Sequence, residues 1–121
     1  MTPSGPPIEK VREEISREIE RVQEESYGAP VNNLRVLLGE DVVTVVMDVV
    51  WSRAEETLVE AGQGDAVRTT REAFQEAIAP TFTAIVERAT GRRVQGFASR
   101  MIVGPEPWAA EVFRLEPRSE P

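Results

Sequence analysis

The side chains of this sequence that could carry chemistry are carboxylates and guanidiniums, because histidine and cysteine are both absent. Arg71 is the most informative of them. It follows Val67 by four residues and precedes Phe74 by three, which places a positive charge on the apolar face of a predicted helix. Asp48 is the matching exception, an acidic residue within the apolar run 42–51. A buried charge is costly unless it is paired, so one hypothesis is a buried Asp48–Arg71 ion pair at a functional pocket, or an anion site at these residues.

A simpler interpretation of these residues needs no pocket. The stem of Arg71 can lie along apolar surface while its guanidinium reaches water, and Asp48 can lie at a sheet edge. A second basic group follows further along the chain, made up of Arg88, Arg92, Arg93 and Arg100. This group is either a docking patch for an anion or an acidic partner, or a set of solvated charges that complement a helix dipole.

The missing residue types exclude several classes of chemistry. Without histidine and cysteine there is no Cys/His zinc site, thiol redox centre, cysteine nucleophile, histidine base or disulfide. The single lysine, Lys10, is not part of a glycine-rich phosphate-binding loop. Ser52 and Ser99 have no histidine to activate them. We therefore expect no enzymatic activity, no metal and no cofactor.

The charge balance narrows the choice of partners. Lysine and arginine number 14 and aspartate and glutamate 21, so the net charge is 14 − 21 = −7. Nucleic-acid binding depends on a basic surface, and anionic membranes repel an acidic chain, so neither is expected as a partner. The start, 1–7, does not resemble a signal peptide, and no apolar run approaches the ~20 residues of a membrane span. These features predict a cytoplasmic protein.

The first segment that could position these side chains is a helix over 7–26. Its apolar residues recur at spacings of three and four and are Ile8, Val11, Ile15, Ile19 and Val22. Such a stripe lines one helical face. The helix either docks on a sheet of its own chain or pairs with another copy in a coiled coil. The stripe lasts barely two heptads, short of a typical coiled coil.

Two strands, 34–38 and 42–51, are predicted to form a hairpin around the turn 39–41. The second strand is rich in β-branched residues and is apolar on both faces. A strand with one wet face should alternate more cleanly. We therefore expect both faces of the sheet to be covered, by helices on two sides or by a second copy of the chain, and the chain to be a homodimer.

The remaining segments complete an α+β fold. Ser52 and Glu55 form a capping box that opens a short helix over 53–61. Asp65 is the predicted cap of a long helix over 66–90, which Pro80 should kink or split. Strands over 94–103 and 108–115 follow. The expected order is α-β-β-α-α-β-β, with a four-stranded, mainly antiparallel sheet packed by helices.

We expect one domain over 7–116, between flexible tails at 1–6 and 117–121, because four of the nine prolines lie in those tails and a fifth, Pro7, adjoins the first tail. The aromatic residues of the strands and their ends are assigned to the core. They are Trp51, Phe97, Trp108 and Phe113.

The order of these segments resembles the MpsC-like family of bacterial proteins over about 8–116. The resemblance rests on the amphipathic first helix, Tyr27-Gly28-Ala29-Pro30 before the hairpin, the segment from Trp51 to Leu58, Arg71 in the long helix, Gly91-Arg92-Arg93-Val94, and the terminal Glu111-Val112-Phe113. The family is named after a cation-translocating system that generates the membrane potential.

The resemblance implies an accessory protein without enzymatic activity, attached to a membrane complex that takes up ions or bicarbonate. It implies a peripheral subunit held at the inner face of the cell membrane by a protein partner, and not inserted in the membrane. Arg71 and the Ser52/Glu55 cap match positions of the family. The alternative hypothesis is a homo-oligomeric sensor that binds a small anion at Arg71.

Overall fold

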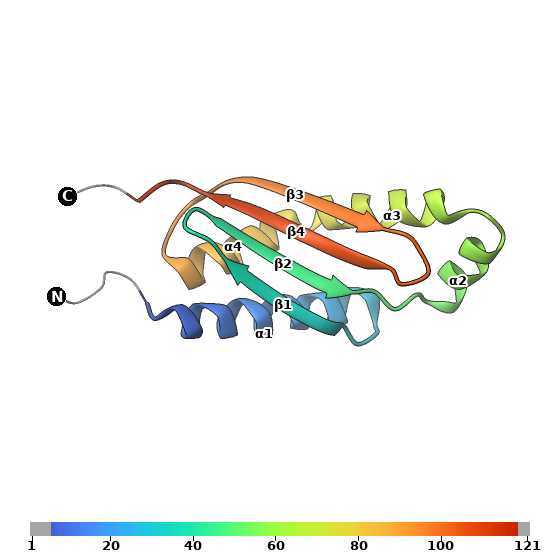
Figure 1. Cartoon of the computed structure of the whole chain (residues 1–121), viewed down its shortest axis with the longest axis horizontal. Coiled ribbons are helices and arrows are strands. Elements are labelled where there is room, and N and C mark those ends of the chain that lie inside the picture. Colours follow the sequence, from blue (N-terminus) through green and yellow to red (C-terminus); the bar gives the residue numbers. More distant parts are fainter. Residues whose placement is uncertain (1–5, 119–121) are drawn as a thin grey trace.

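Residues 6–118 are described by a computed structural model in which helices cover one side of an antiparallel sheet (Figure 1). The elements are α1 (Ile8–Tyr27), β1 (Asn32–Leu38), β2 (Val42–Asp48), α2 (Arg53–Glu60), α3 (Gly64–Ala77), α4 (Ala79–Thr90), β3 (Val94–Ile102) and β4 (Trp108–Leu115). The strand order is β1-β2-β4-β3, and each neighbouring pair is antiparallel. The α+β prediction is confirmed. Residues 1–5 and 119–121 of the predicted tails lie outside the described residues.

The observed order, α-β-β-α-α-α-β-β, has one helix more than expected because the long helix is divided. Ile78 separates α3 from α4, and Pro80 lies in the first turn of α4. A proline is tolerated there because the first N–H groups of a helix have no partner within the helix. The cap of α3 was predicted wrongly. Its N-cap residue is Gln63, and Asp65 lies inside the first turn.

The apolar residues of α1 pack against other elements of the same chain. Val11, Ile15 and Ile19 are buried, and α1 packs on β1 and α4. The sheet-docking interpretation is therefore confirmed and the coiled-coil alternative is wrong. Gly28, with φ 66°, ends the helix in the left-handed conformation that glycine adopts without strain.

Alternate residues of the strands point toward the helices and form the core. This inner face carries Val36, Val43, Val45, Met47, Met101, Ala109, Phe113 and Leu115, all buried. Phe113 is fully buried, and its ring centroid lies 5.1 Å from that of the partly buried Phe97. Trp51 also packs on the core. Trp108 was assigned to the core wrongly, because its position in β4 directs it to the opposite side, where it is 39% exposed.

The opposite side, the outer sheet face, has no helix over it in the described chain (Figure 1). By strand alternation and pairing, this face consists of Arg35, Leu37, Val42, Thr44, Val46, Asp48, Ala98, Arg100, Ile102, Trp108, Ala110, Val112 and Arg114. Of the two alternatives for covering both faces, helices on two sides is wrong, because α1, α3 and α4 all pack on the inner face. Coverage by a second copy stays a prediction.

Candidate functional site

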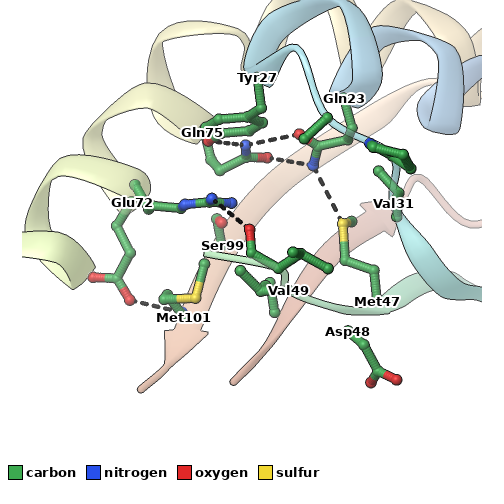
Figure 2. A pocket seen from close by; sticks show the side chains of 15 residues that line it. Gln23, Tyr27, Val31, Met47, Asp48, Val49, Glu72, Gln75, Ser99 and Met101 are labelled. Atoms are coloured by element: carbon green, nitrogen blue, oxygen red, sulfur yellow. Dashed lines mark hydrogen bonds between the residues drawn. The ribbon is translucent and has the colours of Figure 1, made fainter. Parts of the chain in front are cut away.

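Arg71 forms an ion pair, but its partner is Glu55 and not Asp48. Its Nε lies 2.6 Å from Oε2 of Glu55, and its second guanidinium nitrogen lies 2.7 Å from Oε1. Asp48 is exposed, accepts a hydrogen bond of 3.3 Å from Asn33, and points away from the cluster (Figure 2). The predicted Asp48–Arg71 pair is wrong because Asp48 occupies an outward position of β2, between the inward Met47 and Val49.

The carboxylate of Glu55 has two tasks. In the capping box at the start of α2, Ser52 N–H donates to Glu55 Oε1 at 2.9 Å, and Glu55 N–H donates to Ser52 Oγ at 3.1 Å. The same carboxylate then binds Arg71 on α3. Burial alone would raise the pKa of Glu55, but the hydrogen bonds from Arg71 and Ser52 outweigh it and hold that pKa below its ordinary value. The predicted capping box is confirmed.

The guanidinium of Arg71 is enclosed by further contacts. Its central carbon lies 4.2 Å from the centroid of the Tyr27 ring and 5.5 Å from that of Trp51, and one nitrogen donates to the carbonyl of Val50 at 3.4 Å. The side chain is only 11% exposed. An anion would have to displace Glu55, so this geometry does not favour the anion-sensor alternative.

Behind this pair lies a buried amide network that joins α1 to α3 (Figure 2). Gln23 Nε2 donates to Gln75 Oε1 at 3.1 Å, and Gln75 Nε2 donates to Gln23 Oε1 at 3.2 Å and to the Tyr27 hydroxyl at 2.8 Å. Both glutamines are nearly inaccessible to water. The sequence contained a signal for Gln23, which follows the inward Ile19 by four residues, but polarity alone did not mark it as buried.

The space among these residues is small. A cavity of about 30 Å³ lies between the amide network and the sheet, next to Arg71, Ser99 and Met101. That volume admits a water molecule or two, whereas organic ligands occupy pockets of about 300–1,000 Å³. Glu72, at its margin, accepts a hydrogen bond of 2.8 Å from the Met101 N–H. The ion pair, the amide network and the Glu72 hydrogen bond hold α3 against α1, α2 and β3, so they stabilise the fold.

Glu111 is the buried acidic residue that the sequence analysis missed. It is fully buried on the inner face of β4, and neither carboxylate oxygen has a hydrogen-bond partner in the described chain. Burial is the main cause that raises the pKa of Glu111 to about 8. The side chain of Ser99 on the neighbouring strand lowers this pKa, and the negative charge of Glu76 raises it. The signal was present, because Glu111 lies two residues from the inward Ala109 and Phe113.

The predicted docking patch is not one surface. Arg92 is 11% exposed and binds Asp41 and the backbone carbonyls of Glu40 and Glu116, which ties the β1–β2 turn to the end of β4. The exposed Arg88 lies in the last turn of α4, in the helical layer, whereas Arg100 lies on the outer sheet face. Arg93 is exposed just before β3. Arg92 and Arg100 therefore do not form one surface with Arg88, and docking of an anion or an acidic partner at the remaining arginines stays a prediction.

Comparison with known protein families identifies the family to which the chain belongs. Residues 8–103 match the model of a family described as "Na+-translocating membrane potential-generating system (MpsC)". The chain belongs to the MpsC family. The match runs from α1 through β3, so β4 and Glu111 lie beyond it. The suspected resemblance is confirmed.

Neither the characterised proteins nor the solved structures contain a significant relative. Over residues 6–118, no helix has the length and hydrophobicity to cross a membrane. Within the same range, no three His, Cys, Asp or Glu side chains are grouped so that they could hold a metal ion.

Proposed function

We propose that this MpsC protein is an accessory interaction module, without enzymatic activity, of a membrane-potential-generating system. The observation that carries the proposal is the family match over 8–103. The module works at the inner face of the cell membrane, where a protein partner of the ion-translocating complex holds it. Its role is to bind and organise that partner.

The state of the interior polar groups supports a binding role over a catalytic one. The charge of Arg71 is neutralised by Glu55, the amides of Gln23 and Gln75 bind each other, and Glu72 is held by the β3 backbone. General acid–base catalysis requires a side chain within hydrogen-bond reach of a substrate. The cavity beside these groups, about 30 Å³, is too small for one.

Deletion of the gene from its host tests the proposal. We expect the membrane potential, followed with a voltage-sensitive dye, and the Na+ gradient to fall, and the native gene to restore both. Glu111→Gln, which removes the one unpartnered buried acid of the described residues, should restore both equally. An unchanged potential after deletion would refute the link to the system. Failure of a folded Glu111→Gln protein to restore it would refute the non-enzymatic role.

A further inference from the structure

The outer sheet face is an apolar surface without cover in the described chain. Leu37 is 56% exposed, Trp108 39%, Ile102 38% and Val112 37%. The pairing places Leu37, Thr44, Val112 and Ala98 in one row across the strands, and Arg35, Val46, Ala110 and Arg100 in the next. The middle of the face therefore consists of small, mostly apolar side chains, which allow another sheet to approach to about 10 Å.

The two carboxylates at the edge of this face and the guanidinium of Arg114 lie at opposite ends of β4. Asp48 pairs in register with Trp108, and these two residues line a surface hollow of about 380 Å³ together with Arg35, Val46 and Glu106. Two carboxylates thus lie at the end of the face where β4 begins. Arg114, paired with Val42, lies at the other end of β4, about 20 Å away for six residues of extended chain.

We propose that the outer sheet face binds a second copy of this chain, face to face, with a two-fold axis that runs across the strands between the rows of Ala110 and Val112. Rotation about this axis places β4 of the second copy over β4 of the first, with the two strands running in opposite directions. Val112 then faces Ala110 of the second copy. Arg114 enters the hollow of the second copy, where it meets two carboxylates, those of Asp48 and Glu106, against one guanidinium, that of Arg35. The Trp108 ring forms the floor on which Arg114 lies, because the rotation puts Arg114 over Trp108.

The arrangement of the charges favours this axis over a two-fold axis that runs along the strands. A two-fold axis along the strands would keep each row in place and put Arg35 over Arg100, a contact between like charges. The axis across the strands puts Arg35 over Leu37 and Arg100 over Ala98, so both guanidiniums lie on uncharged neighbours. An isologous interface requires one patch to be complementary to itself, and of these two orientations only the axis across the strands avoids a contact between Arg35 and Arg100.

The size of the face also suits a dimer. Four strands about 4.8 Å apart and seven residues of about 3.4 Å each span roughly 19 Å by 24 Å, a flat footprint of about 450 Å². Side-chain relief enlarges that footprint toward the roughly 600–1,000 Å² that each partner buries in a standard interface. The inference does not depend on the proposed function, since it concerns mass in solution and not membrane potential.

A charge-swap experiment tests the inference. Size exclusion with light scattering should give the mass of two chains for the native protein. Arg114→Glu alone should give one chain, because two carboxylates face the introduced one, and the double variant Asp48→Arg/Glu106→Arg should also give one chain. An equimolar mixture of the two variants should again give two chains, because position 114 of each chain then meets opposite charges at positions 48 and 106 of the other.

Three controls complete the experiment. Arg17→Glu makes the same charge change on the exposed surface of α1 and should leave the dimer intact, and circular dichroism should show all variants folded. Val112→Glu at the centre should also give one chain. The inference is overturned by a native monomer, by variants that stay dimeric, by a mixture that stays monomeric, or by a monomer that binds phospholipid vesicles through this face.

Discussion

The two faces of the sheet carry similar residues but have opposite surroundings. On β2, Val43 and Val45 are buried beneath helices, whereas Val42 and Val46 on the outer sheet face are only partly covered. β-branched side chains suit a strand on either side. The difference arises from the placement of the helices: α1, α3 and α4 cover one face, and the remaining helix, α2, packs on α3 and not on the other face. The apolar residues of one face therefore form the core, and those of the other face are the basis of the proposed interface.

Adjacent residues of β4 test this comparison with the largest expected effect. Phe113 is fully buried on the inner face and Val112 is 37% exposed on the outer one. Phe113→Ala leaves a cavity and should lower the free energy of unfolding by about 3–5 kcal/mol. Val112→Ala should lower the free energy of unfolding of the single chain by less than about 1 kcal/mol, because little buried area is lost. Urea denaturation in dilute solution measures both, and equal losses would contradict the distinction between the faces.

Glu111 sharpens the comparison because it is an ionisable residue on the buried inner face. The pKa in the folded chain is about 8, above the ordinary 4.5 of the unfolded chain, so the folded state holds a proton that the unfolded state releases. Its contribution to stability is complete below about pH 4.5 and is lost as pH rises toward 8. The loss amounts to about 1.4 kcal/mol for each pH unit within that window.

Glu111→Gln removes this proton equilibrium and keeps the shape of the side chain. We expect native and variant proteins to be of similar stability near pH 4.5, and the variant to gain on the native protein as pH rises to 8. Thermal denaturation across this pH range measures the difference. Parallel stability curves would show that Glu111 is not a buried, neutral acid in the folded chain.

The ion pair at the end of the sheet should have a smaller effect. Arg71→Met and Glu55→Gln each remove one partner of a pair that is 11% and 19% exposed. Their effects on the free energy of unfolding should be non-additive, with a coupling of about 1–3 kcal/mol. A double-mutant cycle by chemical denaturation measures that coupling. A coupling near zero would mean that the pair contributes no more than a surface salt bridge.

Asp48 should have the smallest effect on the stability of the single chain. It is exposed and bound to Asn33, so Asp48→Asn should change the free energy of unfolding by less than about 0.5 kcal/mol. Combined with Arg71→Met, it should be additive, because the two side chains share no contact. Strong non-additivity in that cycle would restore the original hypothesis of an Asp48–Arg71 pair.

The fold could be predicted because its signals are local. The stripe of α1, the capping box at Ser52, the break at Pro80 and the β-branched strands each follow from spacing and propensity within a short segment. The site depends on contacts between distant segments. Arg71 could be marked as an inward charge, but Glu55 lies on another helix, and its role as a cap concealed its second role as a partner.

Burial of single polar residues was the harder problem for the same reason. Glu111 and Gln23 lie at inward positions of periodic segments, yet the pattern does not show whether such a residue is covered or reaches water. The covering helix decides that, and its position is a tertiary property. Trp108 shows the converse error, because a large aromatic residue was assigned to the core although its register directs it to the uncovered face.

Sedimentation equilibrium of the native chain, from micromolar to submillimolar concentration, tests the central claim most directly. The claim is that the outer sheet face is an interface between two copies. It predicts the mass of two chains for the native protein and of one chain for Val112→Glu, with both proteins folded. A single chain at every concentration for the native protein, or two chains for a folded Val112→Glu protein, would contradict it.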